Sequence, residues 1–351
     1  MRRADLIHSF PQRRPGASLP VSTQPHPCLA QEELMTDERW PRLVVDEWAS
    51  TRELLHMWLQ IVGKVQMVST SLLNHWWNVS FEVSARGLRT HLLHGVAASF
   101  DMEFDFVDHR LVIRDSDGAQ HFIPLVSGSV ADFYARLQEA LVTLSLGCSI
   151  VASPNEVSPA IPFAEDTTVR EYDPVAASTF WRQLVSMEPA FSAWRAGFIG
   201  KDSPVQLFWG SLDLSATRFS GRMAPPHTGN PPNCPPWVMG EAESRENAAV
   251  GFWPGGSPEG SFYAYFYPEP SGYRDAHMPV GHFDTNLGEW ILSYEEVRTS
   301  PDPDKTLLAF LNATYVAGAE AAHWDRAALE VDLHRLDDRM YRGLAAWRRR
   351  L

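Results

Sequence analysis

Residues 100–106 read FDMEFDF, a strict alternation of large apolar side chains with carboxylates. Successive side chains of a β-strand point to opposite faces, so this pattern predicts a strand with one buried and one polar face. The same alternation predicts strands over 75–85 and 110–114, and the second of these leads to the turn signal Asp117-Gly118.

Amphipathic helices are predicted on both sides of these strands. Ser50 and Glu53 match a capping box in front of an apolar repeat of helical spacing. Ser129 and Asp132 begin another helix, which Gly147 ends. The first part of the chain is therefore expected to have the order α-β-β-β-α.

Residues 173–319 predict this order a second time. Asp173-Pro174 begins a helix that we expect to be interrupted near Pro189. After this helix, alternating patterns predict strands over 205–219, 262–267 and 289–297, and an apolar repeat predicts a helix over 307–319.

We interpret the repeated order as an internal duplication. The predicted fold class is α+β, with two pseudo-equivalent α-β-β-β-α halves whose antiparallel sheet or sheets are covered by helices. The expected organisation is a disordered leader over 1–40, a first half over 41–150, a linker over 151–170, a second half over 171–324 with an inserted loop over 221–260, and an amphipathic helix over 325–351. Within the leader, Met35 is a candidate translation start. The final helix docks on its own chain, on a partner helix or on a membrane surface.

Charge and composition exclude several classes of protein. The 30 Lys and Arg against 43 Asp and Glu give a net charge of −13, which argues against a general nucleic-acid binder. No apolar run reaches the roughly 18 residues that cross a bilayer, and no secretory signal is recognisable. The three cysteines, Cys28, Cys148 and Cys234, lack the spacing of a zinc or redox motif. We expect a cytoplasmic protein with neither nucleic-acid nor membrane partners.

Motifs of common enzyme classes are absent from the sequence. There is no G-x-G-x-x-G before a helix, no H-E-x-x-H and no G-x-S-x-G, and Gly197 to Asp202 do not complete a phosphate-binding loop. Aromatic residues are instead abundant, with 13 Trp and 9 Tyr. Tyr263 and Tyr265 share the strand face opposite the predicted core, so they either line a pocket or pack between layers of the fold.

Two further groups of residues are candidates for chemistry. Asp101, Glu103 and Asp105 share one strand face, which either binds a hard cation such as Mg²⁺ or Ca²⁺ or lies in solvent. The inserted loop over 221–260 is rich in proline and aromatic residues and is expected to cover a site, the alternative being an ordinary surface loop.

The sequence resembles a bacterial family catalogued as domain of unknown function 5996, over about Trp48 to Trp324. Distinctive strings carry the resemblance: LHMW (55–58), NHWW (74–77), FDFVDHR (104–110), FWGS (208–211), TRFSGR (217–222), APPH (224–227) and GFWPGG (251–256). No activity comes with this family. The resemblance implies that typical members have histidine at the positions of Gln206 and Arg245, which with His227 and Glu246 would form a transition-metal site. Of these four positions, this chain has a metal-binding residue type only at His227 and Glu246, so no metal ligands are assigned.

The predicted function is a cytoplasmic small-molecule site between the two halves, beneath the 221–260 loop. His227 and Glu246 are the candidate catalytic residues, as base and carboxylate. The candidate ligand-binding residues are Gln206, Trp209, Asp213, Arg218, Arg245, Trp253, Tyr263 and Tyr265. Whether the site is catalytic, and with which cofactor, stays open, as does the oligomeric state. The alternatives are a non-catalytic interaction or scaffold protein and a metal-dependent enzyme.

Overall fold

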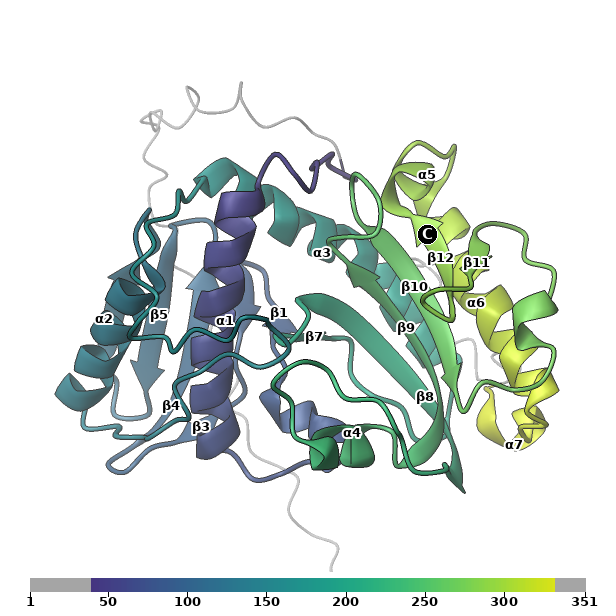
Figure 1. The fold of residues 1–351 in the computed structure, drawn as a ribbon, viewed down its shortest axis with the longest axis horizontal. Coiled ribbons are helices and arrows are strands. Elements are labelled where there is room, and N and C mark those ends of the chain that lie inside the picture. Colours follow the sequence, from purple (N-terminus) through teal and green to yellow (C-terminus); the bar gives the residue numbers. More distant parts are fainter. Residues whose placement is uncertain (1–38, 332–351) are drawn as a thin grey trace, which may run out of the picture. The chain divides into compact units, whose positions relative to one another are not determined.

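The computed structural model describes residues 39–331, in which helices pack against two antiparallel six-stranded sheets (Figure 1). The predicted α+β class is confirmed. The expectation of three strands in each half is wrong, because each sheet has six strands within the described residues. The equivalence of the two halves stays a prediction.

The first sheet is preceded by α1 (Ala49–Ser69) and a 3-10 helix, η2 (Asn74–Val79), and is followed by α2 (Val130–Thr143). Its strands are β1 (Glu82–Val83), β2 (Gly87–Arg89), β3 (Leu93–His94), β4 (Ser99–Asp105), β5 (Arg110–Asp115) and β6 (Gln120–Pro124). They lie in the order β1-β2-β4-β5-β6, and β3 also pairs with β4.

The apolar face of β4 decides how the helices cover this sheet. Phe104 is fully buried and stacks on Phe133 of α2, which in turn stacks on Trp58 of α1 with ring centroids 5.0 Å apart. Figure 1 accordingly shows α1 lying across this sheet. At the start of α2, Ser129 Oγ accepts the Asp132 N–H at 3.0 Å in a reciprocal capping box, as the sequence predicts.

The second sheet is preceded by α3 (Pro174–Ala196). The elements that follow are β7 (Gln206–Phe208), β8 (Asp213–Met223), α4 (Pro236–Ala242), β9 (Arg245–Trp253), β10 (Ser261–Tyr267), η3 (Tyr273–Asp275), β11 (His282–Asp284), β12 (Glu289–Ser293), α5 (Tyr294–Arg298), α6 (Pro303–Ala321) and α7 (Arg326–Leu329). The strand order is β11-β12-β10-β9-β8-β7.

Helices α3 and α6 cover one face of this second sheet. Phe262 of β10 packs on Phe191 of α3, and the ring of Phe266 lies against the backbone of Gly318 in α6. Since Tyr263 and Tyr265 alternate with these phenylalanines, they point to the other face. That face carries the candidate site described below.

The two sheets meet at their edges. Phe81 and Leu207 exchange both backbone hydrogen bonds, each 2.8 Å long, which brings β1 of the first sheet beside β7 of the second. The halves are thus built on two sheets linked by one bridge rather than on one regular sheet.

Two local expectations for the helices are wrong. Ser50 does not cap α1, because its hydroxyl accepts the backbone N–H of Glu171, and the residue at the N-cap position, Trp48, makes no capping hydrogen bond through its side chain. Helix α3 runs unbroken through Pro189, since Phe191 and Trp194 beyond the proline are buried in the core and hold the last turns in place.

Three expected strands also differ from the structure. The strand expected over 205–219 is two strands, β7 and β8, separated by residues 209–212. Residues 74–79 form η2 rather than a strand, and His75 and Trp76 have positive φ angles of 57° and 60°. Contacts with the segment 238–242 hold both residues there: Trp76 Nε1 donates to the Val238 carbonyl, and His75 Nδ1 bonds with the Ala242 carbonyl. The strand expected over 289–297 ends at Ser293, whose hydroxyl caps α5.

The expectation of an inserted loop over 221–260 is wrong for much of its length, because β9 is a central strand of the second sheet. This strand shows no alternation, since both of its faces are covered and one carries only small residues where rings from β10 lie above it. The loop proper is the stretch 224–235, followed by α4.

The predicted boundaries also change at three places. Trp40, assigned to the leader, is buried against Tyr294, while residues 1–38 lie outside the described residues. The linker over 151–170 packs on the first half through Phe163, which is fully buried. The helix expected over 325–351 stops at Leu329 because Glu330 is extended and bridges to Phe198, and residues 332–351 are not described.

Candidate functional site

Two tyrosines form the floor of the site on the face of the second sheet opposite α3 and α6. Tyr263 and Tyr265 stack with centroids 6.2 Å apart, and both rings lie over β9, where their cross-strand partners are Gly251 and Ala249. A Cβ atom at Gly251 would lie 2.1 Å from Cζ of Tyr263, so only glycine leaves room for this ring.

Each tyrosine hydroxyl donates a hydrogen bond to a carboxylate. Tyr263 donates to Asp213 Oδ2 at 2.5 Å, and Tyr265 donates to Glu243 Oε1 at 3.3 Å. Asp213 begins β8 and Glu243 follows α4, so the two sides of the floor come from segments about thirty residues apart. The tyrosines thereby fix the orientation of both carboxylates.

A large cavity of 860 Å³ lies on one side of this floor. Its walls come from α1, β8, β10, β11, β12 and the loop after β9, and they include the carboxylates Glu53, Glu156, Asp213, Asp284 and Glu289. Figure 1 shows the strands β8, β9 and β10 that present this face.

A smaller and more apolar cavity of 430 Å³ shares Asp213, Tyr263, Tyr265 and Glu156 with the larger one. Its other lining residues include six Trp and Phe side chains from η2, the β7–β8 region and α4: Trp76, Trp77, Phe208, Trp209, Phe219 and Trp237. The two cavities therefore adjoin at the tyrosine floor.

Burial shifts the ionisation of the carboxylates around the floor. Burial, aided by the nearby Glu156, raises the pKa of Asp213 to about 6, although the hydrogen bond from Tyr263 opposes the shift. Burial likewise raises the pKa of Glu289 to about 7, with Asp213 and Asp284 adding to the effect. The pKa values of Glu156 and Glu243 are also raised by burial.

These four carboxylates lack a compensating cation in the part of the chain that the structure describes. Glu156, Asp213, Glu243 and Glu289 form no ion pair with a lysine or arginine within residues 39–331. Carboxyl groups that ionise near neutral pH can both donate and accept a proton, which is the property of general acids and bases.

Lys64 is the basic counterpart in the smaller cavity. It projects from α1, is 5% exposed, and donates to Asn155 Oδ1. Burial lowers the pKa of its amine to about 8. The smaller cavity therefore combines aromatic walls with an amine that is partly neutral in mildly alkaline solution.

Two buried polar atoms beside the floor have no hydrogen-bond partner among the described residues. Ser261, on the same face of β10 as the tyrosines, lines the larger cavity and is 2% exposed, and its Oγ is unpartnered. Asn247 lines the smaller cavity, and its Oδ1 is unpartnered, while its amide nitrogen donates to Glu243. Buried polar atoms are rarely left without partners in folded proteins.

Five of the predicted ligand-binding residues line these cavities. Asp213, Tyr263 and Tyr265 contact both, Trp209 lines the smaller one, and Trp253 lines the larger one at 40% exposure. Trp209 is fixed by donating to the Val79 carbonyl at 2.9 Å.

Three other predicted ligand-binding residues line neither cavity. Gln206 is buried, and its Oε1 accepts the hydroxyl of Ser80 at 2.7 Å. Arg245 donates to the neighbouring Ser244 carbonyl. Arg218 lies on the helix-covered face of β8, where its guanidinium stacks 3.9 Å from the Trp194 ring centroid.

The core position of Arg218 follows from strand parity. It shares its face with Leu214 and Ala216, whereas Asp213 points to the opposite side. Burial among aromatic rings lowers its pKa to about 10, still far above neutrality, so the side chain remains a buried cation.

The two predicted catalytic residues do not come together. His227 packs on the Tyr267 ring and bonds through Nδ1 to the Gly229 carbonyl, whereas Glu246 accepts hydrogen bonds from Ser220 and Arg222. Glu246 has the strand parity of the helix-covered residues of β9. The two side chains are therefore on different faces of the sheet.

The metal site that the family resemblance implies does not fit this chain. Gln206 and Glu246 are already occupied by the contacts above, and Arg245 is cationic. No cluster of three or more His, Cys, Asp or Glu between residues 39 and 331 is arranged to hold a metal ion.

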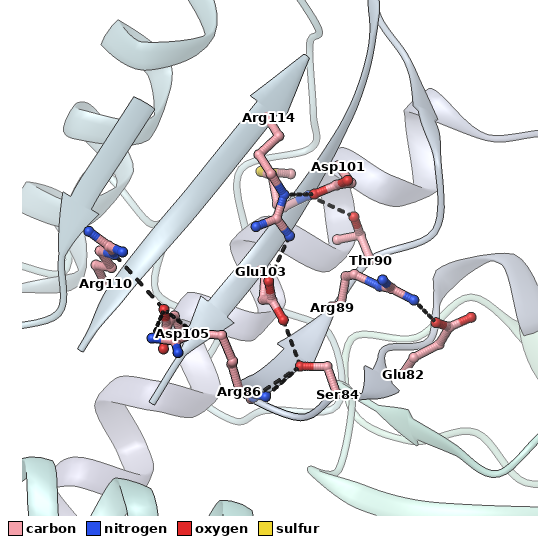
Figure 2. A network of polar contacts seen from close by, with 12 residues as sticks. Glu82, Ser84, Arg86, Arg89, Thr90, Asp101, Glu103, Asp105, Arg110 and Arg114 are labelled. Atoms are coloured by element: carbon pink, nitrogen blue, oxygen red, sulfur yellow. Dashed lines mark hydrogen bonds and ion pairs between the residues drawn. The ribbon is translucent and has the colours of Figure 1, made fainter. Parts of the chain in front are cut away.

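The acidic face of β4 is a network of ion pairs (Figure 2). Arg114 contacts Asp101 at 3.0 Å and Glu103 at 2.6 Å, and Arg86 contacts Asp105 at 2.9 Å. Burial opposes ionisation of Asp105, but hydrogen bonds from Arg86 and from backbone N–H groups hold its pKa below the ordinary value. Because arginines from β5 and the β1–β2 turn already neutralise these carboxylates, the hard-cation interpretation is wrong.

Sequence reasoning missed Glu156, Glu289 and Lys64. Glu156 lies in the predicted linker, where nothing local marks it. Glu289 alternates with the buried Trp290 and Leu292, so the pattern indicates that it lies on the other face of β12. Lys64 interrupts an apolar run in α1. Those two signals were available in the sequence.

Comparisons with known proteins add a family but no activity. No helix among residues 39–331 is long and apolar enough to cross a membrane. No curated protein and no solved structure matches the chain. The family of unknown function DUF5996 matches residues 40–331, and the chain therefore belongs to that family.

Proposed function

We propose that this protein binds a small molecule across Tyr263 and Tyr265, with parts of the ligand in both adjoining cavities. The observation that carries the proposal is the shared floor, where two hydroxyl–carboxylate pairs separate an acidic cavity from an aromatic one. Concave sites with apolar walls and a few oriented polar groups are typical of ligand-binding pockets.

Buried polar groups around the two tyrosines support this proposal. In the part of the chain that the structure describes, Asp213 and Glu289 are partly buried without a lysine or arginine partner, and Asn247 and Ser261 each leave a buried oxygen unpartnered. Such groups cost free energy in the folded protein, and a ligand that satisfies them offsets that cost.

The test places a bulky side chain at a residue that lines both cavities. Ser211 is exposed and lines both cavities, and its hydroxyl donates a hydrogen bond to Glu156 at 2.7 Å. Ser211→Trp is therefore expected to fill part of both cavities without disturbing the core. Ser116→Trp, in the exposed turn between β5 and β6, is the matched control.

Ligand-induced thermal shift and tryptophan fluorescence would be recorded with a panel of cationic, neutral and anionic small molecules. We expect at least one compound to bind the wild type and Ser116→Trp, and to lose binding at least tenfold in Ser211→Trp. A panel in which nothing binds the wild type, or binding that Ser211→Trp leaves intact, would refute the proposal.

We also propose that the protein is cytoplasmic. Cys148 and Cys234, the two cysteines within the described residues, are free thiols, as is usual in a reducing compartment. Fractionation of cells that express the chain at natural levels tests this, and recovery outside the cytoplasm would contradict it.

A further inference from the structure

We propose that the larger cavity receives the positively charged nitrogen of a small organic cation, held between Asp213, Glu289 and Glu156 and beside the ring of Tyr263. This inference rests on the proposed function and names the chemical class of its ligand. Its steps are the charge balance of the cavity, an unpartnered acceptor in its wall, and the aromatic surface beside them.

The charge of the cavity wall is strongly one-sided. Among residues 39–331, five carboxylates line it, and Arg52 is the one lysine or arginine that does so. Arg52 donates to the Pro254 carbonyl at 3.1 Å, and Glu53 pairs with Arg170 at 3.4 Å. Neither interaction neutralises the three carboxylates of the proposed site, Glu156, Asp213 and Glu289.

Each of these three carboxylates can still accept a hydrogen bond from a ligand. Glu156 accepts the Ser211 hydroxyl through Oε2, and Asp213 accepts the Tyr263 hydroxyl through Oδ2. Among the described residues, Glu289 accepts no side-chain hydrogen bond. Because carboxylate oxygens have several acceptor positions, a protonated amine can bond to more than one of these groups at once.

The second observation is the buried hydroxyl of Ser261. It is 2% exposed, its Oγ has no hydrogen-bond partner within residues 39–331, and it lies on the cavity face of β10 next to Tyr263. An oxygen in this position can accept one N–H of an ammonium or guanidinium group while the carboxylates take the others.

The remaining wall favours an organic cation over a bare metal ion. Tyr263, Tyr265 and Trp253 present aromatic surface to the cavity, and cations bind favourably to the faces of such rings. No cluster of three or more His, Cys, Asp and Glu between residues 39 and 331 is arranged to hold a metal ion.

The experiment compares three probes that share a ring and differ in charge: phenethylamine, 2-phenylethanol and phenylacetate. Binding to the full chain would be measured by isothermal titration calorimetry at pH 7.5. We expect phenethylamine to bind at least tenfold more tightly than 2-phenylethanol, and phenylacetate to bind more weakly than either.

Variants locate the effect in the cavity. Asp213→Asn with Glu289→Gln should reduce phenethylamine affinity at least tenfold and leave 2-phenylethanol within twofold. Glu295→Gln, an exposed carboxylate in α5, is the matched control and should change neither. Circular dichroism and thermal unfolding of each variant establish that it is folded.

The possible failures are distinguishable. If 2-phenylethanol or phenylacetate binds as tightly as phenethylamine and Ser211→Trp abolishes that binding, the cavity binds small molecules but the cation inference is wrong. If phenethylamine binds and the double variant binds it equally well, the inference is also overturned. If none of the three probes binds the wild type, the cation inference fails, and the broader panel decides the proposed function.

Discussion

The partly buried carboxylate of Asp213 makes a quantitative prediction about stability. Its pKa in the folded protein is about 6, against an ordinary value of 3.8. A carboxyl group whose folded pKa is raised contributes stability that is fully present below its unfolded pKa and is lost as pH rises through its folded pKa. Asp213→Asn is uncharged at every pH and keeps an oxygen that can accept the Tyr263 hydrogen bond, so it should be more stable than the wild type above pH 6.

The size of the effect follows from the shift. A difference of about two pKa units at about 1.4 kcal/mol per unit gives roughly 3 kcal/mol at pH 8 as an upper limit. The side chain of Asp213 is only partly buried and is coupled to Glu156, Glu289 and the two tyrosines, which reduces the expected gain to roughly 1–3 kcal/mol. At pH 4 the gain should fall to well under 1 kcal/mol, because the wild-type carboxyl is then protonated in the folded state and about half protonated in the unfolded state.

Urea unfolding at pH 4 and pH 8, followed by tryptophan fluorescence and circular dichroism, measures this difference. Glu295→Gln is the control for removal of one negative charge and should shift stability by less than about 0.5 kcal/mol at either pH. An Asp213→Asn variant that is less stable than the wild type at pH 8, or equally stabilised at both pH values, would show that the buried charge is not the cause.

Three further predictions concern the floor and the first sheet. Gly251→Ala places a Cβ atom 2.1 Å from the Tyr263 ring. It should lower the free energy of unfolding by roughly 1–3 kcal/mol and change the near-ultraviolet circular dichroism of the tyrosines. An unchanged melting temperature would contradict this packing. Ser129→Ala removes the α2 capping box and should cost about 1 kcal/mol in urea unfolding, whereas no loss would mean that α2 does not depend on its cap. Asp105→Asn loses the ion pair with Arg86, so it should be less stable than the wild type at pH 7. Because the pKa of Asp105 is lowered in the folded protein, this difference in stability should vanish as pH falls through that pKa. A difference that persists at lower pH would exclude ionisation of Asp105 as its origin.

The sequence predicted the parts of the fold that depend on neighbouring residues. Alternation of period two identified the buried face of β4 and the opposite faces of β10, because burial on one side of a strand selects every second residue. The caps at Ser129 and Asp173 were also predictable, since their hydrogen bonds join residues two or three positions apart.

Some errors about the site were avoidable from the same pattern. Arg218 and Asp213 have opposite parity on one strand, so they cannot both face the same cavity. Other errors were not avoidable: β9 has no alternation because both faces are covered, and the left-handed backbone at His75 and Trp76 depends on contacts with residues 238–242.

By itself, the sequence determined the fold class, the strand face that carries Tyr263 and Tyr265, and the membership of a family. Only the tertiary structure decided that Glu156, Asp213, Glu243 and Glu289 surround those rings, because the four carboxylates come from segments up to about 130 residues apart. Their raised pKa values depend on desolvation, a property of the folded surroundings that no local pattern of residues encodes.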